Sequence, residues 1–270
     1  MKNFKCDKSQ KLSKFLMAEY GAYTTYSTIM KLIRNKDIKL NGKRVGKDVM
    51  LSVGDLLEVY YDGEFKSYQP IYNSLGVLVF NKPPTITSED FESEVQKVYG
   101  DIKLCHRLDR NTAGILVLAK GDAYFEMLSA FKNREIDKFY IAEVYGKLAV
   151  KKARLTAYLV KDATTSQVKI FDQNVEGSVK IITEYEVVKE LEETSVLSIK
   201  LITGKTHQIR AHLAHIGHFI VGDGKYGDNK INKKLKTKRQ KLTAYKIKFN
   251  FNKESKLYPL NDVTVEIKPN

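Results

Sequence analysis

The sequence is short of the residues from which several common classes of protein are built. Its two cysteines, Cys6 and Cys105, are too few and too far apart for a disulfide framework or a zinc module. No apolar run approaches the length needed to cross a bilayer. The basic N-terminus lacks the apolar core and cleavage site of a signal peptide. Together these absences predict a cytoplasmic protein.

Two further absences concern ligands. Tryptophan is missing, but 16 tyrosines and 12 phenylalanines are available for stacking. No glycine-rich loop of the kind that cradles phosphates is present, so nothing in the sequence predicts a nucleotide cofactor.

Acidic residues are outnumbered by basic ones. The chain has 46 Lys and Arg against 32 Asp and Glu, a formal net charge of +14. This imbalance favours a polyanionic partner. Nucleic acid is favoured over a membrane because the charge is not gathered on one amphipathic helix. Lysine-rich codon usage in an AT-rich genome is the alternative explanation for much of the excess.

Apolar periodicity predicts a small α/β unit followed by a larger α+β unit. The first has helices at 9–20 and 25–35, a hairpin centred on Asn41-Gly42 and a strand at 56–61. Turn formers at 63–75 predict a linker. Beyond it, many strands and few helices predict a large mixed, mainly antiparallel sheet. The expected strands are 76–80, 115–118, 138–145, 154–159, 179–188, 196–202, 242–249 and 263–267, and the expected helices 88–99, 122–133 and 206–216.

Residues 9–62 resemble a small RNA-binding domain shared by a ribosomal small-subunit protein, tyrosyl-tRNA synthetase and several RNA-modifying enzymes. The pattern is Lys11-Leu-x-Lys-Phe-Leu, then Ile33-Arg-x-x-x-Ile-x-Leu-Asn-Gly-Lys, then Val53-Gly-Asp-x-Leu. The resemblance implies that the second helix and the hairpin face RNA. A basic helix edge beside a basic hairpin also suits phosphate binding, although a solvated basic face is the alternative. The expected phosphate contacts are Lys31, Arg34, Lys36, Lys43 and Arg44.

The most distinctive stretch of the chain is residues 106–120, which opens with His-Arg-Leu-Asp-Arg. Asp109 is its only acidic residue and lies between two arginines, which favour an ionised carboxylate suited to act as a nucleophile or a base. Residues 111–114 predict a tight turn, with Gly114 free to adopt a positive φ, followed by a buried strand. The alternative is a solvated turn with internal ion pairs.

Residues 203–218 hold four of the five histidines. Histidines recur at every third position from His212 to His218, but no cysteine is near and the only acidic neighbour is Asp223. Catalytic zinc needs three converging ligands, so a metal site is not favoured. Arg210 is the other feature, because a guanidinium can pair bidentately with a carboxylate or a phosphate.

Five ordered blocks make the chain similar to the RluA family of RNA pseudouridine synthases. The resemblance covers about residues 70–270 and implies a catalytic domain at 76–270 behind the small domain at 9–62. The blocks are His106-Arg-Leu-Asp-Arg-Asn-Thr-Ala-Gly with its strand, Asn81-Lys-Pro, Lys138-x-Tyr-x-Ala-x-Val-x-Gly, Thr203-Gly-Lys-Thr-His-Gln-Ile-Arg with Gly217-His-x-Ile-Val-Gly-Asp and Tyr226-Gly, and Leu242-x-Ala-x-x-Ile-x-Phe.

The resemblance assigns roles to matching positions. Asp109 resembles the essential aspartate, and Tyr140 resembles the tyrosine that stacks on the target uracil. Arg210 resembles the arginine that pairs with the aspartate. Arg107 resembles the arginine that fills the gap left in the RNA helix.

Four positions depart from the family's pattern. Lys205 replaces an arginine, Phe219 replaces a proline, Ala113 replaces a frequent serine, and the block at Leu242 lacks the usual histidine. The change at Lys205 loses a planar fork at a contact with RNA. Lys205 and His207 are nevertheless expected to bind RNA, and the three catalytic positions are intact.

The implied reaction breaks the glycosidic bond of uridine, turns the base and rejoins it through carbon five. The base must leave the stack to turn, and an aromatic face can hold it. One carboxylate can add covalently at the sugar or base, or abstract a sugar proton, and the sequence leaves both routes open. The resemblance implies no metal, redox group or nucleotide cofactor.

The sequence therefore predicts a monomeric pseudouridine synthase acting on structured RNA. Large-subunit ribosomal RNA is the first expectation and tRNA the second. A non-catalytic RNA-binding or ribosome-assembly protein and a base-excising glycosylase are the alternatives. The lysine-rich residues 225–241 are expected to be either a basic loop that orders on RNA or a solvated connection.

Overall fold

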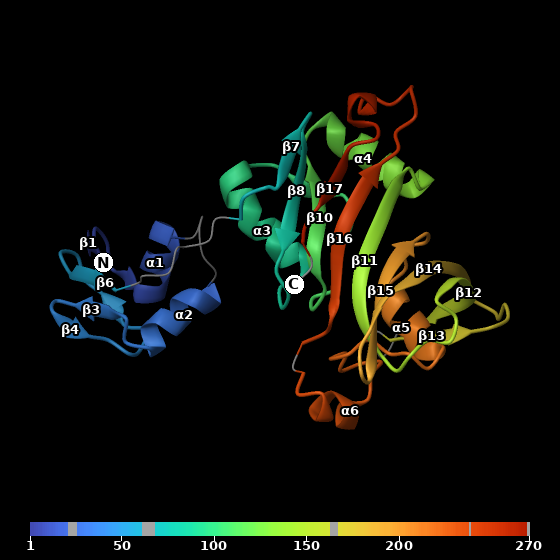
Figure 1. Cartoon of the computed structure of the whole chain (residues 1–270). Coiled ribbons are helices and arrows are strands. Elements are labelled where there is room, and N and C mark those ends of the chain that lie inside the picture. Colours follow the sequence, from blue (N-terminus) through green and yellow to red (C-terminus); the bar gives the residue numbers. More distant parts are fainter. Residues whose placement is uncertain (21–25, 61–67, 163–166, 238, 269–270) are drawn as a thin grey trace. The chain divides into compact units, whose positions relative to one another are not determined.

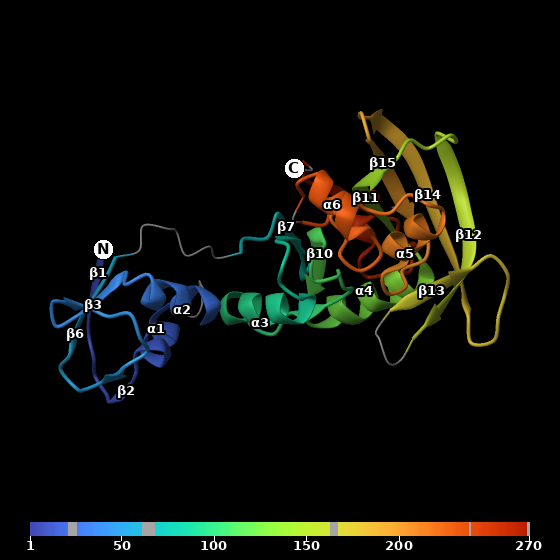
Figure 2. The ribbon, with the colours of Figure 1, turned by 90° about the horizontal axis from the view of Figure 1, so that it is seen from below.

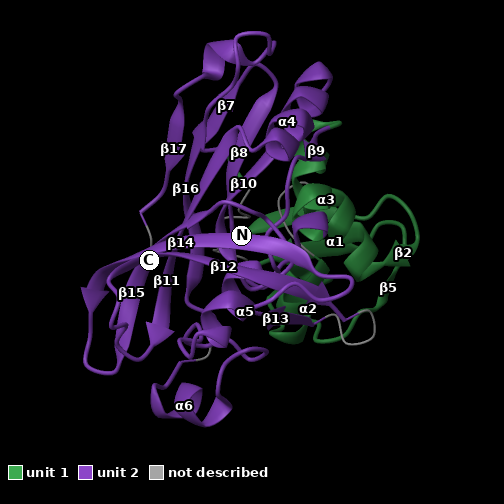
Figure 3. Ribbon diagram, turned by 90° about the vertical axis from the view of Figure 1, so that its right-hand side faces the viewer, with its two compact units in different colours: residues 1–69, 90–101 green, residues 70–89, 102–270 purple. Residues whose placement is uncertain are grey.

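The computed structural model describes residues 1–20, 26–60, 68–162, 167–237 and 239–268. The chain divides into two compact units, residues 1–69 with 90–101 and residues 70–89 with 102–270 (Figure 3). The expected helix end at Gly21 and residues 63–67 of the predicted linker lie outside the described part.

The first unit contains the small sheet and the two helices that pack on it. The sheet order is β1–β6–β3–β4, and a separate pair is formed by β2 and β5. Leu12, Phe15, Leu16 and Tyr20 of α1 are all buried, which confirms the predicted apolar face. The elements are β1 (Lys2–Lys5), β2 (Gln10–Lys11), α1 (Leu12–Tyr20), α2 (Tyr26–Arg34), β3 (Ile38–Leu40), β4 (Lys43–Arg44), β5 (Met50–Leu51) and β6 (Leu56–Val59).

The hairpin between β3 and β4 turns at the predicted Asn41-Gly42. Both residues have positive φ, +48° and +80°, as a two-residue turn of type I′ requires. Arg44 Nη1 donates a hydrogen bond of 2.5 Å to the carbonyl oxygen of Lys36, just beyond α2. The basic hairpin is therefore tied to the basic end of the second helix.

The second unit is built on an eleven-stranded sheet (Figure 1). The order is β13–β12–β14–β15–β11–β16–β10–β8–β7, with β17 paired to β16 and β9 to β10. Only β10 and β16 pair in parallel among the described strands, which confirms a mixed, mainly antiparallel sheet. The strands are β7 (Tyr72–Ser74), β8 (Val77–Lys82), β9 (Lys103–Leu104), β10 (Ala113–Ala119), β11 (Ile136–Tyr145), β12 (Lys152–Lys161), β13 (Val168–Phe171), β14 (Val179–Glu190), β15 (Thr194–Leu201), β16 (Leu242–Phe249) and β17 (Thr264–Glu266).

Helices cover the two halves of this sheet separately. The inner face of α4, Ala123, Met127 and Ala130, joins a core formed with β8, β10 and β16. Ala211 of α5 packs with apolar residues of β12, β13 and β14, and α5 lies beside β13 in Figure 1. The helices of the second unit are α4 (Asp122–Asn133), α5 (Gln208–His215), α6 (Asn229–Lys234) and the 3₁₀ turn η1 (Tyr258–Leu260). Most of α3 (Ser88–Tyr99) belongs to the first unit, which includes residues 90–101.

Two segments differ from expectation. Strand β7 lies within the range predicted as a linker, because pairing with β8 specifies it and its own sequence shows little periodicity. The described part of residues 225–241 contains α6, which lies beyond the lower ends of β11 and β15 in Figure 1 and nearest the viewer in Figure 2. Asp228 caps α6, and buried Asn232 accepts a hydrogen bond from Gly222 N at 2.8 Å. Neither expectation for this segment, a basic loop that orders on RNA or a solvated connection, included this helix, because a polar helix has no apolar stripe that periodicity could reveal.

Gly114 has the predicted positive φ, +114°, but it lies inside β10. A Cβ built at this position would lie 2.1 Å from the carbonyl oxygen of Ala244 on the parallel neighbour β16. Gly114 is thus required by the close approach of two strands as well as by its backbone conformation.

His212 on α5 makes the stability of the second unit depend on pH. The side chain is 1% exposed, and Nδ1 lies 3.0 Å from the Thr183 hydroxyl oxygen. Burial, together with the nearby His215, lowers the pKa of His212 from 6.5 to about 4. The unfolded chain therefore binds a proton first as the pH falls, so stability is lost between these two values.

We expect this histidine to reduce the free energy of unfolding by about 1.5 kcal/mol between about pH 6.5 and pH 5. His212→Asn keeps a polar atom near the position of Nδ1 but cannot titrate. Urea denaturation at both pH values should therefore show a smaller loss in the variant, by about the same 1.5 kcal/mol. Equal losses in the two proteins would contradict this account.

Candidate active site

Asp109 lies on the loop between β9 and β10, and the loop is fixed through its backbone. The hydroxyl of fully buried Ser88 accepts a hydrogen bond from Leu108 N at 2.9 Å and donates one to Leu108 O at 3.0 Å. Thr112 N donates to Asp109 O at 3.0 Å, closing the turn. The carboxylate therefore projects from a backbone with little freedom to move.

Lys82, at the end of β8, is buried beneath this loop with an exposed fraction of 0%. Its Nζ donates to Pro83 O and Ile86 O, both at 2.9 Å, and to Arg110 O at 3.3 Å. Burial lowers the pKa of Lys82 to about 8, although the charge of Asp109 acts in the opposite direction. One ammonium group thus joins the end of β8 to the loop that carries Asp109.

The sheet register places Tyr140 beside the same loop. Ala244 of β16 pairs with Gly114 of β10 on one side and with Tyr140 of β11 on the other. The β11–β16 register shifts between Phe139 and Tyr140, and such a bulge redirects a side chain. Tyr140 is 6% exposed. Its burial, with the charge of Asp109, raises its pKa, so the phenol stays neutral.

Arg210 on α5 bridges two carboxylates. Its Nη1 donates to Asp109 Oδ2 at 2.8 Å. Its Nε and Nη2 donate to Asp223 Oδ2 and Oδ1 at 2.7 Å and 3.0 Å. The Arg210 side chain is 9% exposed and Asp223 is 0% exposed, whereas Asp109 keeps 25%. The guanidinium is therefore held from behind and presents one edge to the carboxylate that remains accessible.

The charges in this cluster support one another. Burial alone would lower the pKa of Arg210, but the two carboxylates outweigh it and raise the pKa. Burial likewise opposes ionisation of Asp223, yet its hydrogen bonds from Arg210 and from the amides of Lys225 and Tyr226 keep its pKa low. Sequence analysis considered Asp223 as a possible metal neighbour and included it in a family block, but did not predict that it pairs with Arg210. The sequence did contain one indication of this pairing, because Asp223 follows a glycine in the same family block as Arg210.

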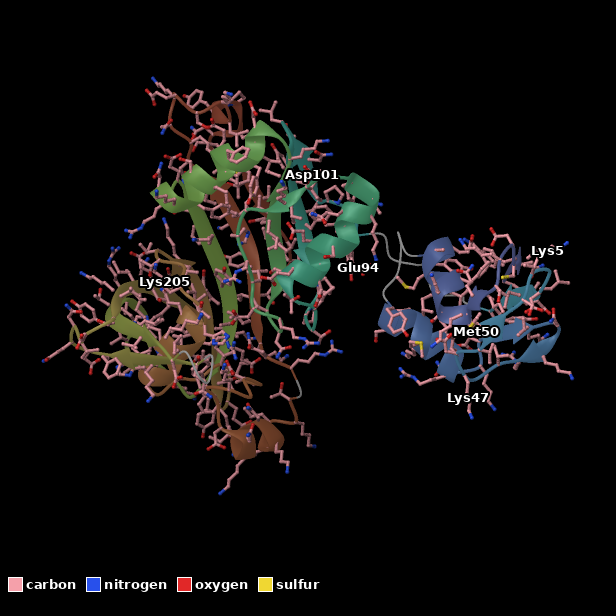
Figure 4. All side chains as sticks on the ribbon, turned by 180° about the vertical axis from the view of Figure 1, so that it is seen from behind. Lys5, Lys47, Met50, Glu94, Asp101 and Lys205 are labelled. Atoms are coloured by element: carbon pink, nitrogen blue, oxygen red, sulfur yellow. The ribbon has the colours of Figure 1, made fainter. Side chains whose placement is uncertain are left out.

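All six residues predicted in this unit line one cavity of ≈ 590 Å³. This volume lies within the roughly 300–1,000 Å³ typical of small-molecule sites. Arg107 is exposed and its Nη1 lies 3.1 Å from Glu89 Oε1, and exposed Lys205 lies on the loop before α5 (Figure 4). The six residues are Asp109, Tyr140, Arg210, Arg107, Lys205 and His207.

The arginines that flank Asp109 in sequence do not pair with its carboxylate. Arg107 contacts Glu89, and Arg110 Nε donates to Thr85 O at 3.1 Å. Arg210, 101 positions along the chain, supplies the ion pair instead. The sequence argument from neighbouring charges thus selected the wrong arginines, whereas the family resemblance selected the right one.

The histidines are largely occupied by structural contacts. His106 Nε2 accepts from Val117 N at 3.1 Å, and burial, with Lys138, lowers its pKa to about 3. His215 pairs with Asp172, and His218 Nδ1 contacts Tyr145 O. Within the part of the chain that the structure describes, no group of three or more His, Cys, Asp or Glu is placed to hold a metal ion.

The five basic residues predicted to bind phosphate in the first unit are all exposed. They lie at the end of α2, just after it, and on β4. No described helix in either unit is long and apolar enough to cross a membrane.

The sheet brings a partly exposed aspartate, a buried tyrosine and a paired arginine to one cavity, an arrangement typical of an enzyme's active site. The RNA pseudouridylate synthase family model matches residues 76–215. The chain belongs to this family and converts uridine in RNA to pseudouridine. This assignment favours the enzyme over the non-catalytic and glycosylase alternatives.

Similar proteins extend the match beyond that range. The chain is 28% identical to ribosomal large subunit pseudouridine synthase C of Buchnera aphidicola subsp. Schizaphis graminum, over 83% of this chain and 80% of the relative. It is 31% identical to an uncharacterized RNA pseudouridine synthase of Helicobacter pylori strain 26695, over 75% and 80%. The fold is similar to that of human RNA pseudouridylate synthase domain containing 1, with a TM-score of 0.65 and 23% identity over 77% and 86%.

The buried support of Arg210 can be tested with Asp223→Asn. Removing one partner of a buried ion pair costs about 3–5 kcal/mol, so we expect urea denaturation to show a loss of that size and activity to fall with it. Asp228→Asn is the matched control on the same segment, because asparagine caps a helix about as well as aspartate. A loss for Asp223→Asn no greater than that of the control would show that Arg210 does not depend on Asp223.

Proposed function

We propose that this enzyme modifies large-subunit ribosomal RNA, with Asp109 as the reacting carboxylate. The observation that carries the proposal is that Asp109, Tyr140 and Arg210 line one cavity although they lie far apart in sequence. The RNA class is supported by relatives named ribosomal large subunit pseudouridine synthase C, from Buchnera and Vibrio. Transfer RNA is the second candidate.

The cavity suits a uridine that has left its stack. The ring of Tyr140 supplies an aromatic face for the base. Asp109 then either adds at the sugar or base, or abstracts a sugar proton. In both routes the bond from the sugar to N1 breaks, a bond to C5 forms, and the C5 proton is released. The isomerisation needs no external oxidant or reductant.

Arg210 holds the Asp109 carboxylate in a fixed orientation through the hydrogen bond to Oδ2. At the rim, Arg107 is exposed and is proposed to enter the space left in the RNA by the flipped nucleotide. Its pairing with Glu89 is between exposed groups and therefore weak enough to exchange for phosphate or base contacts. Lys205 supplies a second cation at the same rim.

The first unit is proposed to dock the RNA. Lys31, Arg34, Lys36, Lys43 and Arg44 are exposed, and the hydrogen bond from Arg44 to Lys36 O keeps helix and hairpin together. Such contacts provide affinity without sequence selectivity. We assign residues 9–62 to this RNA-binding domain and 76–270 to the catalytic domain, acting as a monomer in the cytoplasm.

Asp109→Asn tests the reacting group. We expect pseudouridine formation to fall at least about 100-fold, because the amide is neither a base nor a nucleophile. RNA binding should be retained. The measurement is release of tritium from 5-tritiated uridine in a large-subunit ribosomal RNA transcript. Asp172→Asn, an exposed acid-to-amide change, is the control. Product formation at the control's rate in Asp109→Asn would refute the assignment.

The docking role of the first unit predicts a charge-specific effect. Replacing Lys31, Arg34 and Lys43 by glutamine should weaken RNA affinity and reduce the slope of log affinity against log salt by about 2–3. The matched control removes three exposed lysines elsewhere in the unit, Lys5, Lys8 and Lys14. Filter binding across a salt series measures both. If the slope of log affinity against log salt were the same in the two triple variants, the loss of affinity would depend on net charge alone and not on these three residues.

A further inference from the structure

His207 lies beside the reacting carboxylate, yet no role described above uses its chemistry. It precedes α5 with a left-handed backbone, φ +53°. Its Nδ1 lies 2.9 Å from the Tyr226 hydroxyl oxygen, and its Nε2 lies 3.9 Å from Asp109 Oδ2. The two rings meet edge to face, with centroids 5.6 Å apart. The imidazole therefore spans the distance from Tyr226 to Asp109.

The hydrogen bonds of Tyr226 determine which nitrogen of His207 carries the proton. Val168 N, a fixed donor on β13, donates to the Tyr226 hydroxyl oxygen at 3.0 Å. Among the described residues, His207 Nδ1 is the only group within hydrogen-bond distance that can accept the phenolic proton. Nδ1 is then an acceptor, and the imidazole proton is on Nε2, which faces Asp109.

Arg210 and His207 both approach the same carboxylate oxygen of Asp109, Oδ2. Arg210 Nη1 donates to Oδ2, and His207 Nε2 approaches that oxygen too. Tyr226 supports both neighbours, since its ring lies 5.2 Å from the guanidinium carbon of Arg210. Two nitrogen atoms, Arg210 Nη1 and His207 Nε2, thus lie near the same oxygen of Asp109.

We propose that His207 is a positioning residue of the isomerisation: Tyr226 holds it as a neutral imidazole whose Nε2–H is directed at Asp109 Oδ2. With Arg210, this N–H fixes the carboxylate so that Oδ1 reacts. The inference rests on the proposed role of Asp109 as the reacting group. It adds a short chain of hydrogen bonds, from Val168 through Tyr226 to His207, that links the edge strand β13 to the site.

Several charged groups face His207. Burial lowers its pKa, Arg210 and Lys225 act in the same direction, and Asp109 and Asp223 oppose them. Protonation would also place a hydrogen on Nδ1, opposite the hydroxyl proton of Tyr226. The Nδ1–H group of His207 and the hydroxyl proton of Tyr226 would then face each other, and the hydrogen bond between the two residues would be lost. As His207 becomes charged, acid should therefore inactivate the enzyme, at a pH below that at which an ordinary histidine titrates because its pKa is lowered.

Two substitutions at His207 separate positioning from a structural role. The amide nitrogen of glutamine can occupy the place of Nε2 and keep an N–H toward Asp109. The side-chain oxygen of asparagine can occupy the place of Nδ1 and keep the contact with Tyr226. Asparagine also tolerates a positive φ better than glutamine does. A structural role therefore favours His207→Asn, and the proposed role favours His207→Gln.

Single-turnover kinetics on the tritiated transcript provide the measurement. We expect His207→Gln to keep a rate constant within about 10-fold of wild type, and His207→Asn to be at least about 10-fold slower than His207→Gln, the loss typical of a misplaced catalytic group. The apparent Kd for the transcript should change less than about threefold in both. Equal rates, or a faster His207→Asn, would overturn the proposal.

The pH profile provides a second, independent test. In the wild type, kcat/KM should fall as the pH is lowered. This acid limb of the pH profile should be absent from both His207 variants. Tyr226→Phe removes the hydroxyl that stabilises the neutral imidazole, so its limb should move to higher pH. A limb unchanged in His207→Gln would overturn the proposal. An inactive wild type would instead refute the proposed substrate, which keeps the two failures distinguishable.

Discussion

The second unit depends on one guanidinium placed between two carboxylates. Arg210 comes from α5, Asp109 from the loop before β10 and Asp223 from the turn after the helix, and buried Arg210 is stable only while it is paired. The ion pairs therefore hold three separate segments in one arrangement. Because Asp223 satisfies two of the donors, the remaining edge of the guanidinium is free to orient the carboxylate that is still accessible to substrate.

The sheet supplies the other half of this arrangement. Ala244 on β16 pairs with both Gly114 and Tyr140, so the loop that carries Asp109 and the ring of Tyr140 are positioned by the same strand. The close approach at Gly114 and the bulge at Tyr140 adjust the two neighbours without moving that strand. Below the loop, the buried ammonium group of Lys82 donates hydrogen bonds to the carbonyl oxygens of Pro83, Ile86 and Arg110 and so holds the loop to the end of β8.

The residues proposed for catalysis are buried or half-buried, whereas those proposed to bind RNA in the first unit are exposed. The catalytic groups are fixed by buried ion pairs and hydrogen bonds, where a low dielectric strengthens each contact. The basic residues proposed to bind RNA in the first unit are exposed, where each contributes little to folding but is available for phosphate contacts. The basic helix α6 is an intermediate case, because its exposed lysines are attached through Asn232 to the turn that carries Asp223.

Sequence alone determined the fold class, most helices and central strands, and the identity of Asp109, Tyr140 and Arg210, since apolar periodicity and ordered motifs are local properties. It did not find β7, which its pairing with β8 specifies, β13, which has only four residues, or the short polar helix α6. The argument from neighbouring charges in the sequence also attributed the ionised form of Asp109 to the flanking arginines. Only the tertiary structure decided that Arg210 makes the ion pair, that Asp223 supports it, and that His207 faces the same carboxylate. Those contacts join residues up to 101 positions apart, and their distances depend on sheet register and burial rather than on neighbouring residues.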